Sequence, residues 1–366
     1  MNKILIIQQK MIGDVLTSTL LFEHLKLQFP KAILYYVINE HTLPVVEGNP
    51  FIDHIIIFKN KYKNNPTDLL QFLLSIRKQE FDIVIDVYCK LESNLITLFS
   101  RAPIKISYYK WYTKNLYTHV FKNVTNKNTT VGLAIENRLM LLSPIIKQLN
   151  FPTTSPKIFL TDIEITAARN NLKKHESICG KKKLMLGLFG SATNKSYPLH
   201  YLAILVNFVC KEYQPTIFLN YMPNQQKQVA EFLSLSTPVA LQCIKAQLVC
   251  GSLRNFLAIL KNCDGYIGNE GGASNMAKAL NIPNFSIFSP WISKDAWLTY
   301  NTLTYNRAVH LNDYYLGDLE KISKKDRKKN ALHYYQLFIP ELIKEELKKF
   351  MDEEIFNKQK TIEVSI

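Results

Sequence analysis

Several motifs that assign a chemistry from sequence are missing from this chain. Its six cysteines form no CxxC pair and no Cys/His cluster with zinc spacing, so neither a zinc site nor any other metal site is predicted. No GxGxxG follows a leading strand, which argues against an NAD-dependent dehydrogenase, and the P-loop pattern GxxxxGKS/T is absent. We expect no cofactor.

Long hydrophobic runs are also lacking. No apolar segment approaches the roughly 20 residues that span a bilayer. The N-terminal segment turns polar after a short apolar run and offers no small-residue cleavage site, so we interpret it as a first strand and not as a signal peptide. The widely spaced cysteines fit reduced thiols, and a cytoplasmic location is predicted.

The chain does have length, a large apolar fraction and an excess of positive charge. With 366 residues, 47% of them hydrophobic, it exceeds one ordinary core, so two domains are expected. The formal charge of +15 indicates an anionic partner, which is a phosphorylated substrate, an anionic membrane surface or nucleic acid. No RNP, zinc-finger or GxxG-type module is present, so nucleic acid is disfavoured as a partner.

Two stretches concentrate the basic residues. Residues 321–330 (KISKKDRKKN) are typical of a solvated linker or helix face, or alternatively of a segment attracted to an anionic leaflet. In residues 101–117 basic and aromatic side chains alternate. This pattern is compatible with a face at a membrane interface and also with a strand and its flanking loop.

Short β-branched runs alternate with helix-like segments, which predicts βαβ units and parallel sheets. The alternation pauses at a linker rich in proline and hydroxyl residues, 151–162, and then restarts. The predicted fold class is α/β, with two Rossmann-like doubly wound domains facing a central cleft. They cover residues 1–160 and 161–330, and a helical segment, 331–366, is expected to pack back toward the N-terminal domain. The predicted strands are 3–8, 32–38, 52–58, 81–88, 184–190, 215–221, 265–269 and 284–289. A helix is predicted over 130–149, with Pro144 inside it or ending it.

The loop after the first predicted strand, KMIGD, contains Lys10, Gly13 and Asp14. Open α/β sheets bind ligands at this edge. Gly13 allows a tight turn, and Asp14 follows at or near a helix N-terminus. The Asp14 carboxylate either caps that helix or points into the cleft, where it accepts a proton from an attacking hydroxyl.

Two further loops follow strands of the second half. In GLFGSATNKSYP (187–198), Ser191, Thr193 and Lys195 together favour an anion site, although Lys195 alone is also compatible with an ordinary surface lysine. In GYIGNEGGASNMAKALNIP (265–283), Glu270 precedes two glycines and a helix with small residues. A phosphate can approach backbone N–H groups and the positive helix end there, but a simple tight turn would also use two glycines.

The segments KILIIQQKMIGDVLTSTLLFEHLKLQFPKA and GNEGGASNMAKALNIP resemble the two signature regions of glycosyltransferase family nine, which contains the ADP-heptose:lipopolysaccharide heptosyltransferases. The resemblance runs in order across nearly the whole chain. It implies a GT-B fold, an acceptor site in the first domain, with Gly13 and Lys10 on its loop, and a nucleotide-sugar site in the second. It also implies Asp14 as general base and Lys195 at the donor phosphate. The second signature maps onto Glu270, Gly271, Gly272 and Asn275.

The chain departs from the family pattern at several of these positions. Glu270 stands for Asp, which keeps the charge and extends its reach, while Gly271 lacks the usual hydroxyl. Asn275 replaces His and cannot carry a positive charge. Leu20 stands where the family has proline. These changes indicate a divergent member.

The resemblance implies an inverting, metal-independent transfer of heptose from ADP-heptose to a lipopolysaccharide core or related glycolipid. No DxD motif is present, and Lys195 with a helix dipole can take the place of a metal at the leaving diphosphate. An anionic membrane surface, at the inner face of the cytoplasmic membrane, then suits the basic chain. Two alternatives stay open: a nucleotide-sugar epimerase of GT-B-like fold and a non-catalytic nucleotide-sugar-binding protein.

Overall fold

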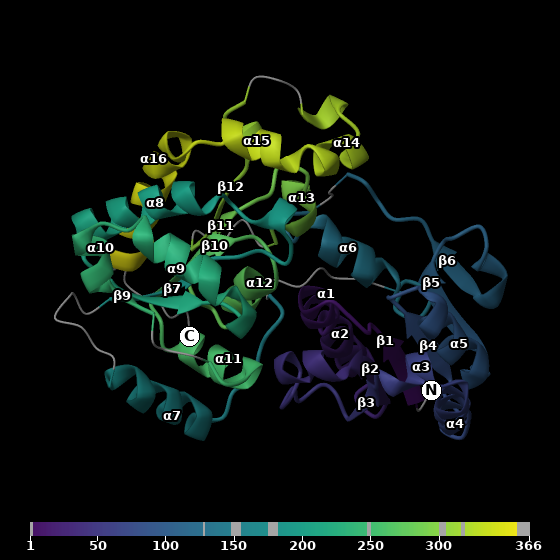
Figure 1. Cartoon of the computed structure of the whole chain (residues 1–366). Helices are drawn as coiled ribbons and strands as arrows, with labels where there is room; N and C mark the ends of the chain where they lie inside the picture. The colour runs from purple at the N-terminus through teal and green to yellow at the C-terminus, as the bar shows by residue number, and fades with distance from the viewer. Residues whose placement is uncertain are drawn as a thin grey trace. The chain divides into compact units, whose positions relative to one another are not determined.

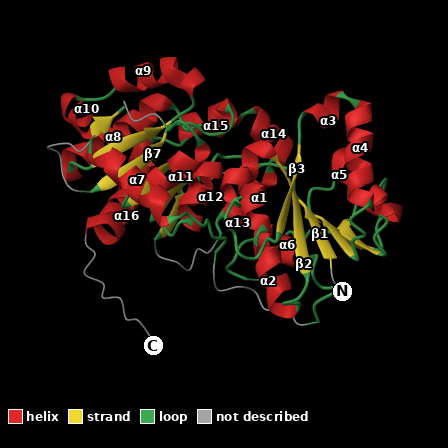
Figure 2. Ribbon diagram, turned by 90° about the horizontal axis from the view of Figure 1, so that it is seen from below, coloured by secondary structure: helices red, strands yellow, loops and turns green. Residues whose placement is uncertain are grey.

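The computed structural model describes residues 3–126, 129–147, 155–174, 182–246, 250–299, 305–315 and 319–356. The chain divides into two compact units (Figure 1). Unit 1 comprises Met1–Phe159 and Asp295–Thr299, and unit 2 comprises Leu160–Lys294 and Tyr300–Ile366. Figure 2 shows helices on both sides of the strands in each unit.

Unit 1 is built on a parallel sheet, with six strands among the described residues. In spatial order they are β3 (His54–Phe58), β2 (Ile33–Asn39), β1 (Lys3–Ile7), β4 (Ile83–Asp86), β5 (Ile104–Tyr108) and β6 (His119–Phe121). The central strands β1 and β4 are almost entirely buried apolar residues, as strands covered on both faces require.

Helices cover both faces of this sheet. On one face α1 (Ile12–Ser18) and α2 (Leu20–Gln28) pack against α6 (Leu133–Met140). On the other face α4 (Pro66–Arg77) and α5 (Leu91–Ser100) form one core cluster with the sheet. Three short helical segments lie in the connections after β2, β3 and β5: η1 (Glu40–Val45), α3 (Lys61–Asn64) and η2 (Lys114–Leu116).

Unit 2 repeats this plan. Its described strands form a parallel sheet in the order β12 (Asn306–Val309), β11 (Asn284–Ile287), β10 (Gly265–Asn269), β7 (Lys183–Gly187), β8 (Thr216–Asn220) and β9 (Ile244–Lys245). Its helices and turns are η3 (Thr193–Lys195), α7 (Asp162–Lys173), α8 (Leu199–Tyr213), η4 (Pro223–Gln225), α9 (Gln226–Ser234), α10 (Pro238–Cys243), α11 (Leu253–Lys261), α12 (Gly272–Ala279), α13 (Lys294–Trp297, whose last three residues belong to unit 1), η5 (Leu311–Asp313), η6 (Leu319–Lys321) and α14 (Lys324–Lys329). The predicted α/β class with two doubly wound sheets is therefore confirmed.

The C-terminal helices α15 (Ala331–Leu337) and α16 (Pro340–Phe350), with the following π-helical segment η7 (Met351–Phe356), pack within unit 2. Ile343, Leu347 and Phe350 form one apolar face of α16 and are fully buried in the core that contains β7 and α8. The expected packing of residues 331–366 toward the N-terminal domain stays a prediction. The apolar face of α16 is matched by α8 and β12, which lie beside it.

Several elements were not anticipated from the sequence. The helix α7 follows the predicted linker and begins with a capping box, in which Thr161 and Glu164 bond each other's backbone amides. The edge strands β6, β9 and β12 are too short to give a clear periodic signal. Of the helix predicted over 130–149, the described residues contain α6, which ends at Met140, before Pro144. Residues 148 and 149 lie outside the described residues.

Candidate functional site

Each sheet has a topological switch point, at which the order of the strands along the chain reverses direction. In unit 1 it lies between β1 and β4, and in unit 2 between β7 and β10. Open α/β sheets bind their ligands beyond the carboxyl ends of the strands at such points. Asp14 follows β1, Lys195 follows β7 and Glu270 follows β10. All three predicted loops therefore begin at the expected places.

Asp14 lies in the first turn of α1, which begins at Ile12 after Met11 as N-cap. Its Oδ2 accepts a hydrogen bond from the Met11 amide at 3.4 Å, which is long for a cap. Gly13 is helical and buried, so it does not form the tight turn expected of it. The peptide bond between Lys10 and Met11 is cis. Because the hydrogen bond from Met11 is long, Asp14 caps the helix only weakly, and its Oδ2 can accept a further hydrogen bond.

The stronger partner of Asp14 is Arg138 on α6. Its Nη2 donates to Asp14 Oδ1 at 2.6 Å, Nε donates to the Ser18 hydroxyl at 3.0 Å, and Nη1 donates to the Ala134 carbonyl at 2.6 Å. The Arg138 side chain is only 9% exposed, whereas that of Asp14 is 30% exposed. Arg138 therefore fixes one carboxylate oxygen from behind and leaves the other accessible.

Lys10 lies at the same edge of unit 1. Burial raises the pKa of Tyr88, which follows β4, and the neighbouring Lys10 ammonium opposes that shift. Burial also lowers the pKa of His41, which follows β2, and the charge of Lys10 adds to this effect. The Lys10 carbonyl accepts a hydrogen bond from Gln8 Nε2 at 2.6 Å. Lys10 thus lies among polar side chains from three neighbouring strand ends.

In unit 2, Asn269 joins the Lys195 loop to the glycine turn. Its Oδ1 accepts from the Tyr197 amide at 2.6 Å, and its Nδ2 donates to the carbonyls of Gly187 and Leu188 at 3.3 and 3.1 Å. The Lys195 loop is also tightly folded, since a Cβ on Gly190 would lie 2.2 Å from the Lys195 carbonyl oxygen. The structure therefore brings the two predicted anion-binding loops together.

Within the Lys195 loop, Ser191 and Thr193 are exposed and Lys195 is half-buried. The glycine turn follows Glu270, and α12 begins at Gly272. Gly271 has a φ of +154°, and a Cβ added there would meet nothing within 4 Å.

Ser274 on α12 completes the turn. Its hydroxyl donates to the Gly271 carbonyl at 3.1 Å and accepts from the Gly271 amide at 3.2 Å. Asn275 is half-buried in the same first helical turn. Open space thus adjoins the positive end of α12.

Glu270 and Lys278 are buried residues of opposite charge that interact electrostatically, and Lys278 was not predicted from the sequence. Their side chains belong to residues that are 7% and 3% exposed. Burial lowers the pKa of Lys278 to about 8, and the negative charge of Glu270 opposes this shift. The Lys278 Nζ donates no hydrogen bond among the described residues. A lysine between alanines in MAKAL was the available signal, because such a helix face is otherwise apolar.

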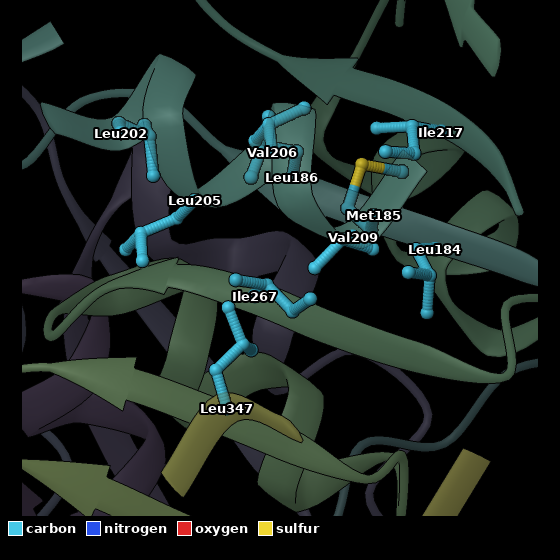
Figure 3. Close-up of a pocket in the computed structure, with 10 residues that line it drawn as sticks. All are labelled: Leu184, Met185, Leu186, Leu202, Leu205, Val206, Val209, Ile217, Ile267 and Leu347. Atoms are coloured by element: carbon cyan, nitrogen blue, oxygen red, sulfur yellow. The ribbon is translucent and has the colours of Figure 1, made fainter. Parts of the chain in front are cut away.

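A cavity in unit 2 is not part of this site. Figure 3 shows it between α8 and the sheet, lined by aliphatic side chains and one methionine. Its volume is about 10 Å3, close to the minimum for one water molecule, and none of its lining side chains is polar. We therefore interpret it as a packing void. Among the described residues, there is no cluster of three metal-ligating side chains, and no helix is long and apolar enough to cross a membrane.

Comparison with known proteins gives a family. The family model of "Glycosyltransferase family 9 (heptosyltransferase)" matches residues 69–315, which is more than half of the chain. The matched region contains Lys195 and the segment from Glu270 to Asn275, whereas Asp14 lies before it. The lipopolysaccharide heptosyltransferase 1 of Campylobacter coli is 25% identical over 297 residues, which cover 78% of this chain and 83% of the relative.

Two solved structures are similar over nearly their whole length. A glycosyltransferase family 9 protein from Veillonella parvula has a TM-score of 0.69 at 16% identity, covering 92% of this chain and 97% of its own. The E. coli ADP-heptose lipopolysaccharide heptosyltransferase II has a TM-score of 0.68 at 18% identity, covering 92% and 99%. These likenesses show the predicted GT-B fold. With the family match, they establish that the chain is a glycosyltransferase that belongs to glycosyltransferase family 9.

Proposed function

We propose that this family 9 member transfers a heptose from ADP-heptose to a lipopolysaccharide core or a related glycolipid, with inversion and without a metal ion. The observation that carries the proposal is the Asp14 carboxylate, whose Oδ1 is bonded to Arg138 at 2.6 Å while Oδ2 has only a long contact with a backbone amide. The names of the relatives from Campylobacter coli and E. coli support this donor and this acceptor.

In this proposal Asp14 acts as the general base. Its Oδ2 accepts the proton of the acceptor hydroxyl as that oxygen attacks the anomeric carbon. The bond between the anomeric carbon and the diphosphate oxygen breaks at the same time, and its electron pair leaves with the nucleoside diphosphate. Because attack and departure occur on opposite faces of the sugar, the anomeric configuration inverts.

The leaving diphosphate acquires negative charge in this step, and the unit 2 loops supply groups that stabilise it. Lys195 contributes an ammonium group, and the turn at Gly271 and Gly272 exposes backbone N–H groups at the start of α12. Ser191, Thr193 and Asn275 are further neutral donors. Glu270, which is buried and interacts electrostatically with Lys278, is assigned to holding the turn in place.

The acceptor is proposed to bind unit 1 near Lys10 and Asp14. An anionic glycolipid fits the net charge of +15, and such a substrate places the enzyme at the cytoplasmic face of an anionic membrane.

The test is a transfer assay with ADP-heptose and a truncated lipopolysaccharide core, run in EDTA. We expect release of ADP that depends on the acceptor, and a product whose anomeric configuration, determined by NMR, is opposite to that of the donor. A changed sugar without acceptor would identify an epimerase instead. Nucleotide-sugar binding without turnover would identify a binding protein, and turnover only with a UDP or GDP sugar would contradict the proposed donor.

A further inference from the structure

Trp291, in the loop after β11, is hydrogen-bonded to the loop that contains Lys195. Its indole Nε1 donates to the Asn194 carbonyl at 2.9 Å, and the Ser289 hydroxyl donates to the same oxygen at 2.7 Å. Asn194 directly precedes Lys195. The indole ring is therefore held at a fixed place beside the loop that follows β7.

Three ammonium groups surround this ring. The Nζ of Lys195 lies 5.3 Å from the ring centroid, that of Lys324 lies 5.9 Å away and that of Lys328 lies 5.2 Å away. Lys324 and Lys328 are one turn apart on α14, within the basic run 321–330. Both lysines are exposed, as on the predicted solvated helix face, and both also lie over the Trp291 ring together with Lys195.

The three charges have no carboxylate partner among the residues that the structure describes. The one carboxylate on α14, Asp326, accepts a hydrogen bond from the Ser323 hydroxyl at 2.6 Å. Any two of these ammonium groups lie at most about 11 Å apart. They repel one another, and salt weakens this repulsion with a Debye length of about 8 Å at physiological ionic strength.

A fourth cation lies on the same helix. The Nε of Arg327 is buried and donates no hydrogen bond within the described part of the chain. Contact with one indole stabilises a cation by only about 0.5–1 kcal/mol at exposed sites. A multiply charged anion would offset the repulsion among these groups and would supply the missing hydrogen-bond acceptors.

We propose that Lys324 and Lys328, with Lys195 and around Trp291, form an anion subsite for the diphosphate of the nucleotide donor, so that α14 is part of the donor site. This inference rests on the proposed function. A diphosphate fits better than a lipid headgroup, because the loop that contains Lys195 is hydrogen-bonded to Asn269, and Asn269 leads into the glycine turn assigned to the donor. The subsite thus adjoins the other groups assigned to the donor.

The test compares two double variants of α14 that remove the same charge. K324A/K328A removes the two lysines at Trp291, and K325A/K329A removes two lysines that make no cation–π contact with it. Affinities for ADP, adenosine and inorganic pyrophosphate are measured by calorimetry in EDTA. We expect K324A/K328A to weaken ADP and pyrophosphate binding by roughly tenfold or more, to leave adenosine binding unchanged, and K325A/K329A to have a much smaller effect.

Equal losses in both variants would overturn the proposal, because they would show only a general effect of net charge. Unchanged ADP affinity in K324A/K328A, together with lost binding to vesicles containing phosphatidylglycerol, would overturn it in favour of a membrane contact. If the wild type prefers UDP or GDP and K324A/K328A weakens that nucleotide, the subsite stands while the proposed donor fails. Absence of binding of any nucleoside diphosphate or pyrophosphate to the wild type would overturn both.

Discussion

Arg138 and Asp14, separated by 124 residues of sequence, are joined by a 2.6 Å contact between Nη2 and Oδ1. The guanidinium is held in turn by the Ser18 hydroxyl and the Ala134 carbonyl. Its planar fork makes three different hydrogen bonds at once, which a lysine cannot reproduce. In the proposed mechanism Arg138 is therefore a positioning residue, which would act on the reaction through Asp14.

Replacing Arg138 with lysine should lower kcat with little change in the KM for the donor. The charge is kept but the carboxylate loses its fixed orientation, and a displacement of about 1 Å at a reacting group can cost about 100-fold in rate. Steady-state kinetics of R138K measure the effect. R77K, at an exposed position on α4, is the matched control and should behave as wild type. A raised donor KM with unchanged kcat would assign Arg138 to donor binding instead.

The Glu270–Lys278 pair should show strong energetic coupling. The two residues are buried and carry opposite charges, so removing one of them leaves the other charge without compensation. For buried ion pairs this typically costs about 3–5 kcal/mol. We expect K278M and E270Q each to be destabilised, and the double variant K278M/E270Q to be much less destabilised than the sum of the two. Urea unfolding of all four proteins gives the coupling energy. Additive losses would show that the two side chains do not stabilise each other.

Lys278 also predicts a dependence of stability on pH. Its pKa is about 8 in the folded protein against an ordinary value of 10.5, so between these pH values the unfolded chain binds more protons at this residue than the folded one. The free energy of unfolding contributed by Lys278 therefore rises with pH from about 8 to 10.5. The stability of the wild type relative to K278M should increase over this range. A constant difference would show that Lys278 keeps its ordinary pKa.

At Gly271 there is room for a side chain, but the backbone conformation is one that residues with a side chain rarely adopt. A Cβ there meets no atom within 4 Å, yet the φ of +154° is one that L side chains rarely adopt. G271A should therefore lose about 1–3 kcal/mol of stability and bind ADP more weakly, since the turn reorganises. G251A is the control, because Gly251 has no such φ and a Cβ there makes only ordinary contact. Equal unfolding energies for G271A and wild type would contradict the backbone argument.

What the sequence could predict here was local. The loops containing Asp14, Lys195 and the two glycines lie directly after strands, and the strand–helix periodicity locates strand ends without any knowledge of tertiary contacts. Arg138, Lys278 and the lysines of α14 were not predicted as site residues. Arg138 contacts Asp14 across 124 residues of sequence, and Lys324 and Lys328 reach Trp291 across more than 30, so local patterns do not reveal either contact. Lys278 stands out only because its side chain is buried, which the sequence does not show. The same limit applies to the C-terminal helices, whose apolar faces are evident but whose packing partner is not.

The most direct test of the account is transfer of heptose to the lipopolysaccharide core by D14N, with ADP affinity measured on the same preparation. Asparagine keeps the size of the side chain and can still contact Arg138 through its amide oxygen, but it cannot accept the proton. We predict that transfer falls by about 100- to 10,000-fold, the range that general-base catalysis supplies, while ADP binding stays at the wild-type level. Transfer by D14N at a rate near that of the wild type would contradict the assignment of Asp14 as the base.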